Sequence, residues 1–302
     1  MILVLRGLGV GDLAASVPAL RAIRAAFPAR TLALAAPGWL TPLVDLIGGV
    51  DHVLPADGLG RPLHAEAPEI AVNLHGRGPQ SHRLLQATEP AKLWAFAAPA
   101  AGHLDGPTWT EEEHEVRRWC RLLRWYGLDA DETDLSLRVP SVDVAKNVTI
   151  VHPGAKSPSR RWPHFPEVAR RLATAGHRVV VTGTETDLAA EVARAAGAPV
   201  LSTSLTELAG LVAHARLVVS GDTGIAHLAT AYRTPSVVLF GPVPPRRWGP
   251  PADRPYHRAI WHGTRVDRGD AAGPGVHPAL LKIGVGEVLD AAEQAERHAV
   301  AA

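Results

Sequence analysis

The chain is poor in cysteine and has almost no excess of charge of one sign. It has 302 residues but a single cysteine, Cys120, so no disulfide can form within the chain. Lys and Arg number 31 against 30 Asp and Glu, which leaves no strong field to attract nucleic acid or an anionic membrane. We therefore expect a protein of the reducing cytoplasm that has no nucleic-acid partner and binds any anion through local arrangement.

The sequence also lacks a long hydrophobic run. No apolar stretch is long enough to span a bilayer, and the apolar start of the chain is short and reaches Arg6 and Asp12 early, unlike a signal peptide. We expect no transmembrane segment; peripheral contact with a membrane stays open, although no basic amphipathic helix favours it. Because hydrophobic residues still make up 46% of the 302 residues, we expect two ordinary domains, each with its own core.

Short apolar runs alternate with helical patterns along the whole chain. A predicted strand at 2–5 precedes a helix at 13–27 and a strand at 31–36, and the same rhythm starts again after the segment 137–147, which contains Pro140. Strands that alternate with helices favour parallel sheets with right-handed crossovers. The pattern predicts an α/β protein with two Rossmann-like halves, and the polar segment between them predicts a hinge.

The most informative stretch is SGDTGIAHLA, residues 220–229, which lies between two apolar runs. It is typical of a strand, a tight turn and the start of a helix, where free backbone N–H groups and the helix dipole suit a phosphate. Thr223 and Gly224 leave the backbone open to a phosphate, whereas Asp222 would repel it and is better suited to sugar hydroxyls. The combination indicates a nucleotide-sugar site; the alternative is that Asp222 only caps the helix.

A second glycine-rich loop, RGLGVGD at residues 6–12, follows the first predicted strand and begins the first helix. It is no dinucleotide-binding fingerprint, because Asp12 stands where the third glycine belongs and the acidic residue expected about 20 positions later is absent. Its glycines leave space for a ligand at the carboxyl end of the sheet, where open α/β proteins bind ligands. Asp12 is therefore a candidate base facing a cleft between the domains, or alternatively a helix cap.

Four segments in order along the chain carry a family pattern. They are R-x-x-x-x-G-D-x-x-x-x-x-P-A-L at 6–20, HPGAKSPSRRWP at 152–163, GDTGIAHLA with PSVVLFGPVPPRRWGP within 221–250, and IGVGEV at 283–288. Together they resemble glycosyltransferase family 9, which contains the ADP-heptose:lipopolysaccharide heptosyltransferases. Each motif alone is moderately specific, but their joint occurrence at these spacings spans nearly the whole chain.

The resemblance implies a GT-B architecture, in which two Rossmann-like domains face each other across a cleft. In this family the acceptor binds mainly to the N-terminal domain and the nucleotide-sugar donor mainly to the C-terminal domain. We therefore expect an acceptor domain at residues 1–140, a donor domain at 147–277, and a closing helix at 278–302 that packs back toward the N-terminal domain.

The resemblance also implies an inverting, metal-independent reaction, in which an acceptor hydroxyl displaces a nucleoside diphosphate from the sugar. A carboxylate should take the proton of this hydroxyl, and Asp12 matches the family's catalytic aspartate. Thr223 and Gly224 match its phosphate-binding turn. No His, Cys or Asp cluster has metal-ligand spacing, and the D-x-D within 129–134 is typical of a solvated loop. We therefore expect no cofactor, with the donor, ADP-heptose, bound as a substrate.

Further donor-site candidates lie in the second half of the chain. Arg160 stands where many family members carry Lys, and Arg161 beside it is a second candidate to contact phosphate or sugar. His227 would reach the diphosphate or orient the acid of the turn. Glu185 or Asp187, after a predicted strand, would bind the ribose, and the spacing from the preceding glycine favours Asp187. Alternatively, the arginines lie on the surface and His227 is hydrogen-bonded in the core.

The acceptor side is less defined by the sequence. The segment 73–85 follows a predicted strand and resembles the family's acceptor loop, with His75, Arg77 and Gln80 as candidates to meet acceptor hydroxyls or phosphates. The first loop lacks the small hydroxyl residues of many members, which leaves the acceptor open between a lipopolysaccharide core and a glycosylated small molecule such as an antibiotic. Two other functions stay open: a nucleotide-sugar epimerase or hydrolase of the same fold, and a noncatalytic nucleotide-sugar-binding protein.

Overall fold

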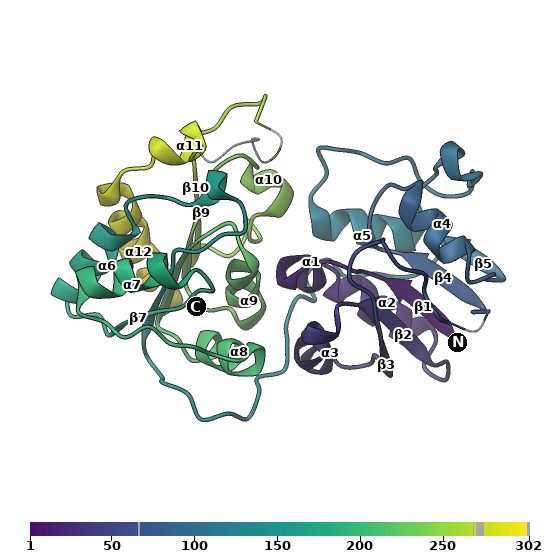
Figure 1. Cartoon of the computed structure of the whole chain (residues 1–302), viewed down its shortest axis with the longest axis horizontal. Coiled ribbons are helices and arrows are strands. Elements are labelled where there is room, and N and C mark those ends of the chain that lie inside the picture. The colour runs from purple at the N-terminus through teal and green to yellow at the C-terminus, as the bar shows by residue number, and fades with distance from the viewer. Residues whose placement is uncertain (66, 268, 270–274, 301–302) are drawn as a thin grey trace. The chain divides into compact units, whose positions relative to one another are not determined.

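The computed structural model describes residues 1–65, 67–267, 269 and 275–300. The chain divides into two compact units, Met1–Arg138 and Val139–Ala302, and the division falls within the predicted hinge segment. Each unit is built around a five-stranded sheet in which all neighbouring strands are parallel (Figure 1). The predicted α/β class with two Rossmann-like halves is therefore confirmed.

The first sheet has the strand order β3-β2-β1-β4-β5. Its strands are β1 (Ile2–Leu5), β2 (Leu32–Ala36), β3 (His52–Pro55), β4 (Ile70–Asn73) and β5 (Lys92–Trp94). All four side chains of β1 are buried, as expected for a central parallel strand covered on both faces. Because the chain leaves β1 toward one edge and resumes at β4 on the other side, the topological switch point lies between the carboxyl ends of β1 and β4.

The helices of the first unit are short. They are α1 (Val10–Ala15), α2 (Val17–Ala26), α3 (Thr41–Ile47), α4 (Gln80–Gln86) and α5 (Glu115–Trp125), with the 3₁₀ turns η1 (Gly38–Leu40) and η2 (Pro99–Ala101). The helix predicted over 13–27 is divided at Ser16, because Pro18 has no N–H group and fits the first turn of a new helix. The sequence over 111–127 has a helical pattern with acidic residues at its start, but the helix α5 begins only at Glu115, where the His114 ring accepts the N–H of Val116.

The second sheet has the strand order β10-β9-β8-β6-β7. Its strands are β6 (Thr149–His152), β7 (Val179–Val181), β8 (Leu217–Gly221), β9 (Ser236–Phe240) and β10 (His257–Trp261). The switch point of this sheet lies between β6 and β8. The helices are α6 (Phe165–Thr174), α7 (Thr186–Ala196), α8 (Leu205–Ala213), α9 (Gly224–Tyr232), α10 (Pro245–Trp248), α11 (Pro278–Leu281) and α12 (Val285–Val300), with the 3₁₀ turn η3 (Pro158–Arg160).

The sequence pattern did not reveal one strand, β10. The range 242–277 is rich in Pro, Gly, Arg and His, which is typical of irregular loops, but the structure places α10 and β10 within it, and β10 pairs with β9 along its whole length. The strand is at the edge of the sheet and only partly buried, so it lacks the continuous apolar run of a central strand. Residues 268 and 270–274 of this range lie outside the described part of the chain.

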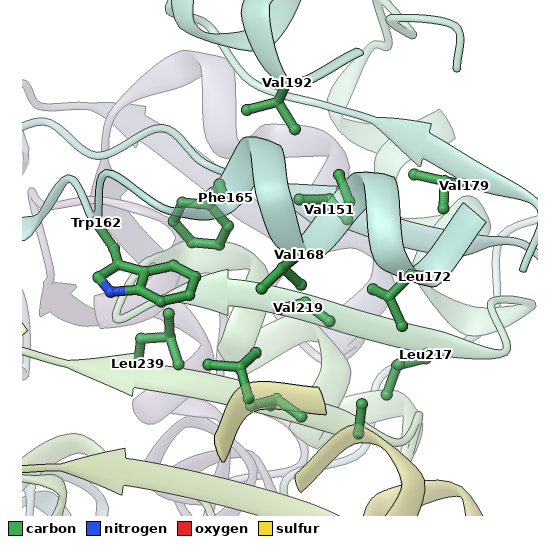
Figure 2. Packing of buried hydrophobic residues seen from close by; sticks show 14 of the residues in the cluster. Val151, Trp162, Phe165, Val168, Leu172, Val179, Val192, Leu217, Val219 and Leu239 are labelled. Carbon is green, nitrogen blue, oxygen red and sulfur yellow. The ribbon is translucent and has the colours of Figure 1, made fainter. Parts of the chain in front are cut away.

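The core of the second unit lies between its sheet and one layer of helices (Figure 2). Trp162, Phe165, Val168 and Leu172 pack against the sheet side chains, and α6, α7 and α12 form the layer that covers this face (Figure 1). The helix α12 contributes its buried residues, Val288, Ala291, Ala292 and Ala295. Its apolar face therefore packs in the second unit, and the expectation that the closing helix also reaches back toward the N-terminal domain stays a prediction.

The substitution Leu172→Ala tests this core. Leu172 is 3% exposed, and truncating it should lower the free energy of unfolding by about 2–5 kcal/mol, because the site loses buried apolar contacts and gains a cavity. Leu281→Ala is the matched control in the same unit, since Leu281 is 54% exposed and should change stability by about 0.5 kcal/mol or less. Urea unfolding followed by circular dichroism measures both. Equal losses in the two variants would contradict the packing in Figure 2.

Candidate functional site

Asp12 lies at the switch point of the first sheet, two residues into α1 and shortly after β1. Its Oδ2 accepts the backbone N–H of Gly9 at 3.3 Å, and its Oδ1 lies 3.2 Å from Nη2 of Arg6. The side chain is 28% exposed. Both contacts are at the long end of the hydrogen-bond range, so the carboxylate keeps lone pairs for a substrate proton. Asp12 therefore caps its helix, as the alternative interpretation held, and is also open to a ligand.

The pKa of Asp12 is raised above its ordinary value. Burial is the largest cause, and the negative charge of Glu115 acts in the same direction. The guanidinium of Arg6 and the N–H of Gly9 oppose the shift, because they stabilise the charged form. A carboxylate with a raised pKa is a stronger proton acceptor than an exposed aspartate, which is the property that a general base needs.

Arg6 links the loop of Asp12 to two other segments of the first unit. Its buried guanidinium donates to the backbone oxygen of Asp12 at 3.0 Å, to the backbone oxygen of Leu74 and to Oε1 of Glu115 at 3.0 Å. The group also lies over the indole ring of Trp119, 4.8 Å from the ring centroid. Arg6 therefore joins the loops after β1 and β4 to the helix α5.

Close backbone packing explains one glycine of this loop. A side chain on Gly7 would place its Cβ 3.2 Å from the oxygen of Gly58 and 3.3 Å from that of Ala56. The N–H of Gly58 donates to the oxygen of Gly7 at 3.2 Å. Glycine thus lets the segment after β3 approach the loop that carries Asp12.

Of the acceptor candidates, the structure brings His75 to this loop. The Nδ1 atom of His75 accepts the N–H of Gly7 at 3.2 Å, which fixes the neutral tautomer with its proton on Nε2. Burial, together with the charge of Arg6, lowers the pKa of His75 to about 4. His75 therefore presents a neutral N–H donor beside the loop of Asp12.

Arg77 and Gln80 are not brought to Asp12 by any hydrogen bond or ion pair recorded for the described residues. Both side chains are exposed, and Arg77 forms an exposed ion pair with Glu111 at 2.9 Å. Gln80 begins the helix α4. The neighbouring His82 is fully buried and bonded to the oxygen of Phe96 at 2.8 Å, so it is a core histidine. Of the three acceptor candidates, only His75 has a described hydrogen bond to the loop of Asp12.

In the second unit, Asp222 and Arg160 lie together at the switch point. Asp222 follows β8, is 8% exposed, and its Oδ2 lies 2.9 Å from Nη1 of Arg160. The same Nη1 lies 3.3 Å from the backbone oxygen of Asp222. Arg160 ends the turn η3, in the loop that follows β6. The two candidates taken from separate motifs therefore form one ion pair, and Arg160 is not an isolated surface residue.

The turn after Asp222 has the predicted conformation. Thr223 is the N-cap residue of α9, with extended backbone, and Gly224 is the first residue of the helix. The first N–H groups of such a helix have no partner within the helix, so they suit an anion. His227 lies one turn further along, half-buried, with its ring at 5.7 Å from that of Trp248. These residues lie on one turn of α9 and its cap.

Arg161 contacts a different acid. It donates through Nε to the oxygen of Ala155 at 3.0 Å and lies 3.3 Å from Oε1 of Glu185. Glu185 reaches close to the loop after β6, since a Cβ on Gly154 would lie 2.1 Å from its Oε2. Asp187, in contrast, is exposed in the first turn of α7. The structure therefore favours Glu185 over Asp187, against the preference from spacing, as the acid that faces the loop after β6.

No role was assigned from the sequence to two residues near Asp12, namely Arg6 and Glu115. Arg6 belongs to the quoted motif, and its place directly after a buried strand was a usable signal. Glu115 had no such signal, because an acidic residue in the first turn of a helix is ordinarily explained by the helix dipole. Only the fold shows that Glu115 is buried and contacts Arg6, which is 109 residues away in the sequence.

The described residues contain no group of three or more His, Cys, Asp or Glu side chains placed to hold a metal ion. Among the helices that the structure describes, none combines the length and apolar character needed to cross a membrane.

Comparison with known proteins identifies the family. The profile of glycosyltransferase family 9 (heptosyltransferase) matches residues 108–268. Over 340 residues the chain is 26% identical to lipopolysaccharide heptosyltransferase 2 of Salmonella typhimurium, and the match covers 96% of each protein.

Solved structures agree on the fold. The structure of E. coli ADP-heptose LPS heptosyltransferase II matches with a TM-score of 0.77 at 22% identity, over 99% of each chain. The dodecameric iron-containing heptosyltransferase TibC of enterotoxigenic E. coli H10407, in complex with ADP-D-β-D-heptose, matches with a TM-score of 0.66 at 14% identity, over 98% of this chain and 76% of TibC. These likenesses confirm the predicted GT-B architecture. Since the family profile covers more than half of the sequence, including the loops of Arg160 and Asp222, the chain belongs to glycosyltransferase family 9 and is a glycosyltransferase.

Proposed function

We propose that this enzyme is an inverting heptosyltransferase that moves heptose from ADP-heptose to an acceptor hydroxyl, with Asp12 as general base and without a metal. The observation that carries the proposal is the carboxylate of Asp12, which is partly exposed at the switch point of the first sheet and has a raised pKa. The relatives named as heptosyltransferases support the choice of sugar, and the ADP-heptose named for two of the solved structures supports the donor.

The proposed step is a single displacement at the anomeric carbon. The acceptor oxygen forms a bond to this carbon while its proton passes to Asp12, and the bond from the carbon to the phosphate oxygen breaks. ADP leaves with that electron pair. Because the acceptor attacks the face opposite to the leaving group, the configuration inverts. An alcohol is a weak nucleophile, so the carboxylate at Asp12 supplies the base that the step requires.

We assign acceptor binding to the domain at residues 1–140. His75 is the acceptor contact that the geometry supports, since its Nδ1 accepts the N–H of Gly7 in the loop of Asp12 and its neutral Nε2–H is the atom that would donate to an acceptor hydroxyl. Arg77 and Gln80 stay weaker proposals, because both are exposed and Arg77 is paired with Glu111. The acceptor is a carbohydrate or a glycosylated small molecule.

We assign donor binding to the domain at residues 147–277. The leaving diphosphate gains negative charge in the transition state, and preorganised N–H groups and cations lower the energy of that charge. Thr223, Gly224 and Arg160 are proposed for this role, and His227 lies on the same turn of α9. Asp222 would accept hydrogen bonds from the sugar hydroxyls.

The ribose is proposed to bind to Glu185, next to Arg161. A carboxylate at the carboxyl end of a strand is a common partner of ribose hydroxyls in doubly wound α/β folds. Asp187 is retained only as the weaker alternative. The cytoplasmic location expected from the single cysteine belongs to the same proposal.

A panel of nucleotide-sugars tests the donor. A ligand that binds only the folded state stabilises it by about 2.7 kcal/mol at 100 times its Kd, which corresponds to roughly 5–10 °C in the Tm of a unit of this size. ADP-heptose should give such a shift in a thermal-shift assay, and UDP-, GDP- and TDP-sugars should not. Transfer from ADP-heptose after incubation with EDTA should proceed at the untreated rate.

Three outcomes would contradict this proposal. A larger shift and transfer from another nucleotide-sugar would refute ADP-heptose as the donor. Loss of transfer with EDTA, restored by iron or magnesium, would refute metal independence. Release of ADP at the same rate with and without any acceptor would indicate a hydrolase in place of a transferase.

A further inference from the structure

Glu115 is a buried acid, only 5% exposed, whose carboxylate accepts from three charged or polar side chains. Its Oε1 accepts from Nη2 of Arg6 at 3.0 Å and from Nε1 of Trp119 at 3.0 Å. Its Oε2 is bonded by Nη1 of Arg118. A carboxylate costs several kcal/mol to bury in this way unless it is paired, and many proteins avoid the cost by using apolar residues. The position of Glu115 therefore calls for a role other than capping α5.

Arg6 is shared between Glu115 and Asp12. The same Nη2 atom lies 3.0 Å from Oε1 of Glu115 and 3.2 Å from Oδ1 of Asp12. Arg6 is also fixed by its bonds to two backbone oxygens and by the ring of Trp119, so it cannot turn freely toward either acid. One immobile cation thus divides its interaction between two carboxylates, one buried and one partly exposed.

We propose that Glu115 is a positioning residue for the transfer reaction: by sharing Arg6, it prevents this arginine from pairing fully with Asp12 and keeps the Asp12 carboxylate basic enough to take the acceptor's proton. This inference rests on the proposed role of Asp12 as general base. Glu115 acts only through Arg6 and is not assigned any contact with substrate.

The charges around Asp12 support this division of Arg6. Arg118, Glu115, Arg6 and Asp12 alternate in sign, so the group as a whole is neutral. A further titratable neighbour in the described part of this unit is His75, across the Gly7 loop, and it is neutral because its pKa is lowered to about 4. Burial and Glu115 raise the pKa of Asp12, whereas Arg6 lowers it. Without the charge of Glu115, Arg6 would act on Asp12 alone and the pKa of Asp12 would fall.

Glu115→Gln in the full chain is the direct test. Glutamine keeps the size of the side chain and an oxygen that accepts from Arg6, but it removes the charge. The titration of Asp12 is followed by ¹³C NMR of the side-chain carboxyl in protein labelled at aspartate, with the signal assigned by its absence in Asp12→Asn. The midpoint should fall by about one pH unit relative to the wild type. An unchanged or higher midpoint would overturn the inference.

The pH dependence of transfer should follow the same shift. The base works only when deprotonated, so kcat/KM falls as the pH drops through the pKa of Asp12. Because this pKa is raised, the acid limb of the wild type lies above the ordinary aspartate value of about 3.9. In Glu115→Gln the limb moves to lower pH, and kcat on the plateau falls several-fold, since a weaker base transfers the proton more slowly.

Glu113→Gln is the matched control. Glu113 lies two residues before Glu115 and pairs with Arg121 at 2.7 Å, so its variant also removes a carboxylate from an Arg pair in this region. It should leave the Asp12 midpoint and the acid limb unchanged. A shift of the same size as in Glu115→Gln would overturn the inference, because any loss of charge nearby would then suffice.

Glu115→Asp guards against a glutamine variant that fails to fold. Aspartate keeps the charge, but its side chain is one methylene group shorter and its carboxylate lies farther from Arg6. The titration midpoint of Asp12 should therefore lie between those of the wild type and Glu115→Gln. If only the aspartate variant folds, a midpoint at or above the wild-type value overturns the inference. The NMR readout needs no catalysis, so the two proposals can fail separately. Transfer at the wild-type rate by Asp12→Asn would refute the proposed function. An inactive Asp12→Asn, together with an unchanged Asp12 midpoint in the Glu115 variants, would refute only this inference.

Discussion

Asp12→Asn is expected to lower the rate of sugar transfer by about 10²–10⁴-fold, the range found when a general base is removed. The amide has the shape of the carboxylate and still offers one oxygen to Arg6 or to Gly9, so the loop should keep its conformation. It cannot accept the proton of the acceptor hydroxyl. Initial transfer rates measure the loss, and isothermal titration calorimetry with the donor should show an unchanged Kd.

Asp51→Asn provides the control for this experiment. Asp51 lies in the same unit and is likewise bonded by an arginine, Arg24, and by a backbone N–H, that of Leu32 at 2.8 Å. Its variant should transfer sugar within about twofold of the wild type, since surface charges contribute little. Equal loss of donor binding and transfer in Asp12→Asn would mean that Asp12 supports the structure, and retained transfer would remove it as the base.

Asp222→Ala is expected to weaken binding of the nucleotide-sugar by about 10- to 100-fold, which corresponds to the loss of one or two hydrogen bonds to a charged group. The affinity for free ADP should fall much less, because ADP lacks the heptose whose hydroxyls Asp222 is proposed to bind. The Arg160 guanidinium loses its carboxylate partner, so its charge acts more fully on the diphosphate. Calorimetric titration with the donor and with ADP separates the two effects.

Asp253→Ala is the control in the same unit, because Asp253 is exposed and should change neither affinity. An equal fall for ADP and for the nucleotide-sugar would mean that Asp222 maintains the turn before α9 and does not hold the sugar. Unchanged affinity for both ligands would place Asp222 outside the donor site.

Much of the fold was predictable because local patterns carry it. Apolar runs such as 2–5 and 217–219 are buried strands, and the loops that follow them carry Asp12 and Asp222. The sequence was less informative where an element is weakly patterned. The edge strand β10 has no continuous apolar run and was not identified.

Part of the candidate site was also predictable. Arg160 and Asp222 were named from separate motifs, and the structure joins them in one ion pair. The preference for Asp187 over Glu185 stays untested as a prediction of ribose binding, but the spacing along the chain could not tell that the Glu185 side chain lies beside the loop after β6. Gly154 decides this point, since only a residue without a Cβ lets Glu185 approach.

Residues close together in the chain were enough to predict the class of fold, the family and the two loops that carry Asp12 and Asp222. Tertiary structure alone decided how basic Asp12 is and which residues set that basicity. Arg6 and Glu115 are 109 residues apart, and their contact exists only because α5 packs beside the loop after β1. Electrostatic interactions of this kind depend on distance and burial in space, and neither quantity is written in the order of the residues.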